Sequence, residues 1–247
     1  MRVLLPGFAP ILAGLQSSRE VARLPARGGV PAARLLAGRL SVGNCDAYVI
    51  DAPDLYLRQG GPYADAQQRP FPDNHLRFAR LCWAAAEIAN AVDPQWTPRI
   101  VHAHDWHAGL TPTCMRELAV TVKSVFSIYI LAFQGLFPGE VFDQLGLPAA
   151  RFAMDGVEFY GQVSFMKAAL QMADAITTVS PRYAREIQTC EQGMGLDGLL
   201  RSRADRLSGI LNGVDAAVWN PAHDAAIAAT YSAQDLDGKA LCKAALQ

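Results

Sequence analysis

The residues best suited to chemistry form a short polar cluster at the end of an apolar run over residues 99–103. The cluster consists of His102, His104, Asp105, Trp106 and His107. In an open α/β sheet, ligands bind where strands end and helices begin, so this is a favourable position for a site. The Asp105 carboxylate can accept hydrogen bonds from hydroxyl groups, and the Trp106 indole offers a flat face to sugar C–H groups. The cluster therefore favours a carbohydrate site.

A metal site is a second interpretation of the same cluster. A His-x-His pair with a nearby Asp and His is typical of metal-dependent hydrolases, which would use His102, His104 and His107. Such a hydrolase needs further ligands downstream. The two remaining histidines, His75 and His223, stand in no ligand motif.

Purely structural roles are a third interpretation. His102 and His104 lie on the same face of a strand, where they can be hydrogen-bonded structural side chains. Asp105 can be a helix N-cap alone, and Trp106 can be a core side chain alone. The other tryptophans are expected to be structural: Trp83, Trp96 and Trp219.

Strand-like apolar runs alternate with helical patterns along the chain. This alternation predicts a parallel α/β sheet, and the lack of repeats and flexible linkers predicts one domain over residues 1–247. The strands are expected at residues 2–5, 45–50, 99–103, 124–129, 175–179 and 208–211. The helices are expected at residues 73–92, 164–173, 181–188, 197–206 and 235–247. In the first of these helices Arg77, Arg80 and Glu87 form a narrow polar stripe, so most of its circumference should be buried.

Composition narrows the class of protein. The net charge is −1 and the basic residues are scattered, which gives a nucleic-acid partner no electrostatic support. The five cysteines are far apart and form no Cys-x-x-Cys pair, a pattern typical of reduced thiols in a cytoplasmic protein. The longest apolar run, residues 124–133, has the length of a buried strand and is too short to span a membrane.

Several segments spread over nearly the whole chain carry a family pattern. They are VHAHDWHAGL, IDAPDLYLR with GGPYAD, PDNHLRFARL, LAFQGLFP, GQVSFMKAAL, ITTVSPRYAREI and LSGILNGVDAAVWNP. Together they resemble the amino-terminal half of bacterial glycogen synthases and plant starch synthases, which are retaining glucosyltransferases that lengthen an α-1,4-glucan from ADP-glucose. The resemblance implies a two-Rossmann-domain (GT-B) fold with its active site between the domains. This chain would supply the first domain, with a doubly wound, mostly parallel sheet.

The resemblance also implies roles for individual residues. Asp105 would be the catalytic residue of the sugar site. The substrate-binding residues would be Tyr63, His104, Trp106, Asn212 and Gly213. Tyr63 would face the acceptor cleft, and Asn212 and Gly213 would form a turn beside it. No cofactor and no metal are implied, because ADP-glucose is the donor substrate and the glucan is the acceptor.

The sequence departs from the family pattern in three places. The family begins with another strand and a Lys-Thr-Gly-Gly-Leu loop on the donor diphosphate, and this chain starts after it. The second Rossmann domain, with its diphosphate-binding cations, would follow Gln247. Tyr129 stands where the family has a His that binds the donor glucose, and Ile130 stands where it has an Asn.

The departures bear on activity. Loss of the cationic groups on the diphosphate removes electrostatic stabilisation, commonly the largest catalytic contribution, so we expect the chain alone not to catalyse. A non-catalytic α-glucan-binding module built on Tyr63, Asp105 and Trp106 is the alternative function. A metal-dependent hydrolase built on the histidine cluster ranks below it.

Overall fold

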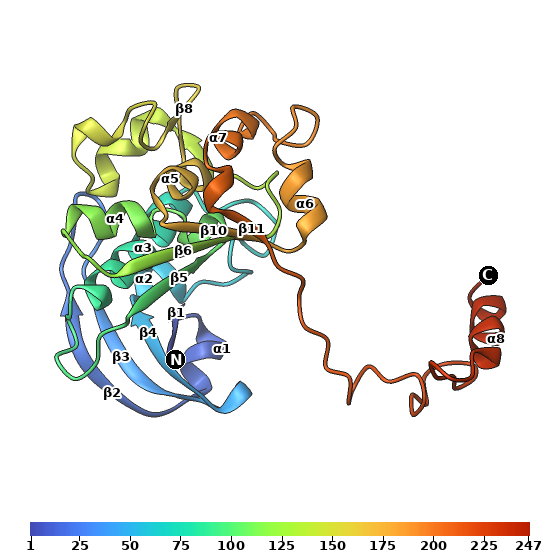
Figure 1. The fold of residues 1–247 in the computed structure, drawn as a ribbon. Helices are drawn as coiled ribbons and strands as arrows, with labels where there is room; N and C mark the ends of the chain where they lie inside the picture. The colour runs from blue at the N-terminus through green and yellow to red at the C-terminus, as the bar shows by residue number, and fades with distance from the viewer. The chain divides into compact units, whose positions relative to one another are not determined.

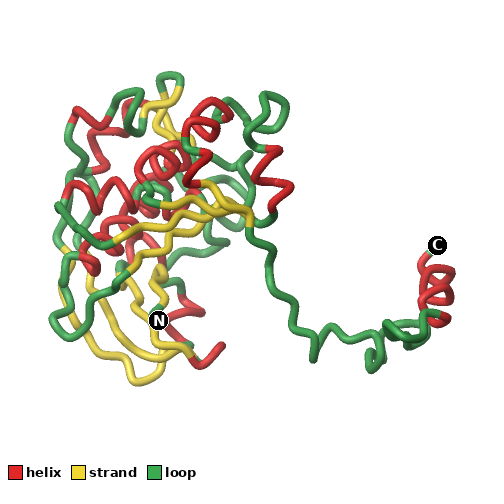
Figure 2. The backbone as a smooth tube through the Cα atoms, in the orientation of Figure 1, coloured by secondary structure: helices red, strands yellow, loops and turns green.

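The computed structural model describes residues 1–247 and divides them into two compact units, Met1–Ile210 and Leu211–Gln247. The single domain expected over the whole chain stays a prediction. The first unit holds both large sheets, whereas the second is mostly loop and ends in helix α8 (Asp237–Leu246) (Figure 2). No helix in the structure combines the length and apolar character needed to cross a membrane.

One sheet of the first unit is parallel throughout. Its four strands lie in the order β11-β10-β6-β5, and every strand in it was expected from the sequence. Because all four strands run the same way, their carboxyl ends meet at one edge of the sheet (Figure 1). The strands are β5 (Ile100–His104), β6 (Lys123–Ile128), β10 (Ala175–Thr178) and β11 (Leu207–Gly209).

The other large sheet is mixed. Its order is β1-β4-β3-β2, with a parallel pair between β1 and β4 and antiparallel pairs elsewhere. The sequence predicted β1 and β4 but not the hairpin of β2 and β3, because β2 is largely exposed and its residues do not alternate between apolar and polar. The strands are β1 (Val3–Pro6), β2 (Leu15–Leu24), β3 (Ala33–Leu40) and β4 (Cys45–Asp51).

Helix α3 (Asn74–Ala89) is buried on every side. Its apolar residues enter the cores of both large sheets, as Trp83 does beside β5 and Ile88 beside β4. The polar stripe expected on this helix is buried as well. Arg80 donates to Glu87 at 2.5 Å, and the pair is 0% and 4% exposed. Helix α3 therefore packs against both large sheets.

The remaining elements complete the first unit. Ser164 and Ser180 cap α5 and α6, respectively, by accepting hydrogen bonds from backbone N–H groups. A small three-stranded sheet, in the order β7-β9-β8, lies outside the two large ones. The helices are α1 (Ala9–Ala13), α2 (Pro53–Tyr56), α4 (Thr111–Glu117), α5 (Phe165–Met172), α6 (Pro181–Glu186) and α7 (Asp197–Ser202). The small strands are β7 (Leu136–Pro138), β8 (Glu158–Phe159) and β9 (Gln162–Ser164).

Two expectations about the second unit are wrong, and one about the first is confirmed. Trp219, expected to be structural, is 72% exposed. Neither Asn212 nor Gly213 has a positive φ, and no turn is assigned to them, so the turn expected there does not form. Trp83 is 1% exposed and donates its indole N–H to the Leu145 carbonyl at 2.8 Å, as a structural tryptophan should.

Candidate functional site

Asp105 is the first residue after β5, at the edge where the parallel strands end. Its N–H donates to the Ser127 carbonyl at 2.9 Å, and its φ of +57° is unusual for a residue other than glycine. Such backbone strain concentrates at functional positions. The carboxylate accepts the Trp106 N–H at 2.7 Å through Oδ1, which caps the 3-10 helix Trp106–Ala108. The N-cap interpretation is confirmed, and Oδ2 remains free for a ligand.

The Asp105 carboxyl group is partly buried. Removal from water raises the pKa of Asp105. Partial burial and the charge of Asp105 also raise the pKa of the Tyr63 phenol, which places these two side chains close to one another. A carboxylate that is partly desolvated and only half used by its own backbone is a strong acceptor for hydroxyl groups.

An aromatic group stands beside the carboxylate. The Trp106 ring lies 4.9 Å from Phe78 in an edge-to-face contact and 4.1 Å from His107. Tyr63 stacks on His107 at 5.0 Å and lies 6.3 Å from Trp106. Tyr63 is 47% exposed, so the group offers an accessible aromatic surface next to Asp105. The structure thus brings together Tyr63, Asp105 and Trp106.

Gly135 fixes how closely the next loop approaches Trp106. Its φ is +58°, and a Cβ built at this position would stand 2.5 Å from Cε3 of the indole. Only glycine satisfies both conditions at low cost. The loop between β6 and β7 therefore packs its backbone directly against the indole and holds that side chain in place.

The neighbouring histidines are hydrogen-bonded across the sheet. Nε2 of His102 lies 2.7 Å from Ser127 Oγ, and Nδ1 of His104 lies 3.0 Å from the Tyr129 hydroxyl. The two imidazoles are 4.1 Å apart, on the same strand face as expected. Burial lowers the pKa of both rings, and the proximity of His102 lowers that of His104 further, so both favour the neutral form. This arrangement agrees with the structural interpretation of the pair.

The histidine cluster does not form a metal site. No group of three or more His, Cys, Asp or Glu side chains in residues 1–247 is placed to hold a metal ion. His107 faces the aromatic group instead, and burial lowers its pKa to about 4. The metal-hydrolase hypothesis therefore lacks the ligand geometry it requires.

Tyr129 lies at the end of β6, next to β5, and its ring stacks on His104 at a centroid distance of 6.0 Å. It is 41% exposed, and Ile130 beside it is 52% exposed. Tyr129, which stands where the family pattern has a His, therefore lies at the strand-end edge, and its hydroxyl is paired with His104. Asn212 and Gly213 belong to the second unit, so their place beside the site stays a prediction.

Gln134 is a candidate that the sequence did not reveal. It is 6% exposed, its Nε2 donates to the Met194 carbonyl at 2.9 Å, and its Oε1 has no hydrogen-bond partner. An unpaired buried acceptor costs about 1–3 kcal/mol and calls for an explanation. Gln134 directly precedes Gly135, the residue that contacts Trp106. Its only sequence signal was its place in LAFQGLFP.

A comparison of folds defines the class of protein. The catalytic domain of Starch Synthase IV from Arabidopsis thaliana, solved with ADP and acarbose bound, matches this structure with a TM-score of 0.72. The match covers 99% of this chain and 58% of that chain at 23% identity. The fold is therefore that of the first domain of a two-Rossmann-domain (GT-B) glycosyltransferase.

Sequence comparison then gives the family. The chain belongs to the starch synthase catalytic domain family, whose pattern matches residues 1–202. Glycogen synthases from Leptothrix cholodnii and Variovorax paradoxus are 59% and 54% identical to it over 255 and 257 residues. Each alignment covers 100% of this chain and 52% of the relative. The chain thus spans about half the length of the curated relatives it matches.

Proposed function

We propose that this chain is the acceptor-facing, amino-terminal half of a glycogen synthase that extends an α-1,4-glucan from ADP-glucose. The observation that carries the proposal is the convergence of Asp105, Trp106 and Tyr63 at the carboxyl edge of the parallel sheet, in a chain of this family. The relatives are named glycogen synthases, and the Arabidopsis domain was solved with ADP and acarbose. These names support a glucan acceptor and an adenine nucleotide sugar.

Each residue of the group has a role suited to its chemistry. Asp105 accepts hydrogen bonds from glucosyl hydroxyls through its free oxygen, and its burial strengthens them. Trp106 packs its face against the sugar C–H groups, while Tyr63 borders the acceptor. His104 supports the site indirectly, because its hydrogen bond with Tyr129 joins the ends of two neighbouring strands.

We propose further that residues 1–247 bind glucan without transferring glucose. Arg77, a cation packed against Phe78, donates to the carbonyl oxygens of Leu55 and Pro62 and is 1% exposed, so it cannot hold a diphosphate. Transfer requires stabilisation of the negative charge on the leaving diphosphate. The non-catalytic α-glucan-binding function is therefore the second candidate, favoured by an accessible aromatic surface without a free cation in contact with it.

Tyr129 is expected to limit transfer in the assembled enzyme. A phenol paired with His104 cannot reproduce the hydrogen bonds of an imidazole to a sugar, and Ile130 provides no hydrogen-bonding group. The five free cysteines, two of them buried, are compatible with a reducing compartment, and we assign the protein to the cytoplasm on that basis.

Binding is tested first, on the chain itself. Maltoheptaose is titrated into residues 1–247 and followed by calorimetry and by tryptophan fluorescence. We expect saturable binding that weakens about tenfold in Trp106→Ala and somewhat less in Tyr63→Ala. Tyr160→Ala is the matched control, because Tyr160 is 80% exposed and touches Phe159 rather than the aromatic group. Equal affinity in Trp106→Ala and Tyr160→Ala would contradict the assignment.

Catalysis is tested in a chimera. Residues 1–247 replace the matching half of the Leptothrix cholodnii glycogen synthase, and incorporation of glucose from ADP-glucose into glycogen is measured. The isolated chain should be inactive, and the double change Tyr129→His with Ile130→Asn should raise transfer in the chimera. A chimera that binds glucan but gains nothing from the double change would remove Tyr129 as the limiting residue. Failure of Asp105→Asn to lower transfer would remove the role of Asp105.

A further inference from the structure

Tyr63 reaches the candidate site from a long loop. The loop covers residues 57–73 and joins α2 to α3. The Tyr63 ring stacks on His107 at 5.0 Å and is 47% exposed. A ring that is half exposed has few contacts to fix its place, so the backbone that carries it must be held. The bonds made by the backbone around Tyr63 therefore decide whether its ring lies beside the site.

Two residues in the first turn of α3 hold this backbone. Asn74 donates from Nδ2 to the Tyr63 carbonyl at 2.9 Å, and Arg77 donates from Nη1 to the Pro62 carbonyl at 2.7 Å. Asn74 is 7% exposed and Arg77 is 1% exposed. Helix α3 is itself packed between the cores of both large sheets. The loop is thus anchored to a rigid element at the residue that carries the ring.

Arg77 also fixes the orientation of the Asn74 amide. Its Nη1 donates to Asn74 Oδ1 at 2.6 Å. A guanidinium carries donors only, so the amide oxygen must face Arg77, and the amide NH₂ group is thereby directed at the Tyr63 carbonyl. The bond from Asn74 to Tyr63 therefore depends on Arg77 as well.

The acceptors of Arg77 are all uncharged. Besides the Pro62 carbonyl and Asn74 Oδ1, its Nε donates to the Leu55 carbonyl at 2.7 Å. The Phe71 ring, from the same loop, lies 4.6 Å from the guanidinium carbon. A buried charge without a carboxylate partner is costly, and an apolar side chain would avoid that cost. We account for the charged residue by what it holds, which is the loop over residues 57–73 and the end of α2.

We propose that Asn74 and Arg77 are positioning residues for glucan binding, which hold the Tyr63 ring beside Trp106. Asn74 makes the direct bond, while Arg77 orients Asn74 and binds the preceding carbonyl. Both are buried, so they act through Tyr63 and not on the sugar. This inference rests on the proposed function, which assigns Tyr63 to the acceptor. Loss of the anchor would leave Trp106 in place and remove one aromatic wall of the site.

The loop also has bonds within itself. The Phe71 N–H donates to the Tyr63 carbonyl at 3.0 Å, and Arg58 donates to both carboxylate oxygens of Asp73 at 2.7 and 2.6 Å. These bonds shape the loop and join its two ends. They do not connect the Tyr63 carbonyl to α3. The experiment must therefore separate the anchor on α3 from the loop's own bonds.

The first test is Asn74→Asp, because it removes the bond to Tyr63 and keeps the packing of α3. A carboxylate has nearly the same shape as the amide, offers Arg77 a charged partner, and has no N–H for the Tyr63 carbonyl. The unfolding midpoint should therefore not fall. Maltoheptaose affinity should fall about threefold, which is no more than the loss in Tyr63→Ala.

A double-mutant cycle shows whether Asn74 acts through Tyr63. When Asn74→Asp is made in the Tyr63→Ala chain, affinity should change less than about 1.5-fold, because no ring remains to be positioned. The imidazole NMR signals of His107 provide a second measure, since Tyr63 stacks on this ring. In the chain without glucan, Asn74→Asp should shift these signals in the direction that Tyr63→Ala shifts them.

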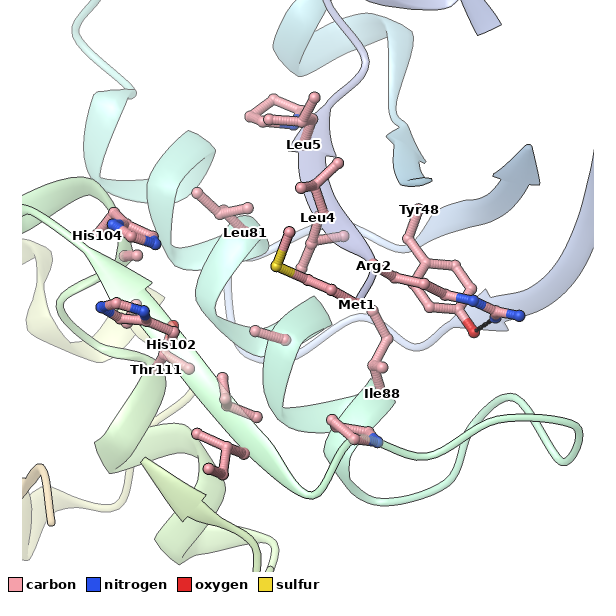
Figure 3. Close-up of a pocket in the computed structure, with 18 of the residues that line it drawn as sticks. Met1, Arg2, Leu4, Leu5, Tyr48, Leu81, Ile88, His102, His104 and Thr111 are labelled. Carbon is pink, nitrogen blue, oxygen red and sulfur yellow. Dashed lines mark hydrogen bonds between the residues drawn. The ribbon is translucent and has the colours of Figure 1, made fainter. Parts of the chain in front are cut away.

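Tyr48→Phe is the matched control for the loss of one buried hydrogen bond. It removes the bond from the Tyr48 hydroxyl to Asp93, which measures 2.6 Å. Tyr48 lines the groove between β1 and β5, of about 460 Å³, to which none of residues 57–77 contributes (Figure 3). This variant should change neither the maltoheptaose affinity nor the His107 signals.

Three results would overturn the proposal. They are unchanged affinity in Asn74→Asp, an equal loss with and without the Tyr63 ring, and a loss without any shift of the His107 signals. If Asn74→Asp does not fold, Asn74→Ala takes its place in the same cycle. Absence of maltoheptaose binding by the unchanged chain would instead remove the proposed function. The His107 signals would then show by themselves whether Asn74 positions Tyr63.

Discussion

The two large sheets of the first unit use their polar residues in different ways. In the parallel sheet, the carboxyl edge presents groups with unused hydrogen-bonding capacity, such as Asp105 Oδ2 and the partly exposed Tyr129. Around the mixed sheet, by contrast, buried polar groups pair with one another: Tyr48 is 1% exposed and donates to Asp93 at 2.6 Å. Polar groups that are hydrogen-bonded to one another stabilise the fold, whereas polar groups with unused hydrogen-bonding capacity are available to a ligand. The difference locates the site.

The largest effect is expected in the buried ion pairs that support the mixed sheet. Glu87→Ala removes the partner of Arg80 and of Arg27, the latter at 3.0 Å. An uncompensated buried guanidinium should lower the free energy of unfolding by about 3–5 kcal/mol. Glu186→Ala, in an exposed helical pair with Arg182, is the control and should cost less than about 1 kcal/mol. Urea unfolding measures the free energy of unfolding of both variants. Equal losses would contradict the distinction between buried, paired polar groups and exposed ones.

The next effect concerns the loop behind Trp106. Gly135→Ala adds backbone strain at φ +58° and a clash with the indole, and we expect a loss of about 2–4 kcal/mol. Gly161 has a φ of +78° with open space around it, so Gly161→Ala isolates the backbone strain at about 1 kcal/mol. For both variants, thermal unfolding measures the stability and a maltoheptaose titration measures the glucan affinity. A displaced indole predicts that glucan binding falls only in Gly135→Ala; loss of binding in both would contradict this reasoning.

The third effect is the pH dependence that His107 contributes. Burial lowers its folded-state pKa to about 4, so the unfolded chain takes up this proton first as the pH falls. Its contribution is complete above pH ~6.5 and is lost between pH ~6.5 and ~4, by about 1–2 kcal/mol after allowance for the ring's partial exposure. His107→Phe should flatten the stability profile in that window. The test compares the unfolding midpoints of the wild-type chain and His107→Phe at pH 7 and 4.5. An unchanged difference between the two pH values would show that other groups dominate the pH dependence of stability.

The smallest effect separates strain from function at Asp105. Asp105→Ala loses the cap and keeps the strained φ, whereas Asp105→Gly loses the cap and relieves the strain. The glycine variant should therefore be more stable than the alanine variant by about 1 kcal/mol. Both should lose glucan affinity, since neither has a carboxylate. If the alanine variant proves the more stable, the positive φ is not a source of strain.

The sequence predicted the parallel sheet strand by strand. Each of its strands is a short apolar run bounded by polar or turn residues, and such runs indicate buried strands whatever lies beside them. Asp105 and Trp106 were predicted as a site for the same reason, since they follow such a run directly. The hairpin of β2 and β3 was missed because its strands are stabilised by pairing with each other, and β3 also by pairing with β4, while their residues show no pattern of their own.

What only the folded chain decided is which distant residues meet. Tyr63 reaches Trp106 because the loop that carries it is tied down by its carbonyl bond to Asn74, and no spacing rule connects residues 43 positions apart. The groove between β1 and β5 likewise depends on the order of strands in two sheets, which local patterns do not determine. Periodicity and composition depend on neighbours in sequence, so the sequence by itself determined the strands of the parallel sheet and the family. Packing, burial and strand order depend on contacts through space, so the tertiary structure decided the site's geometry and the unpaired edges.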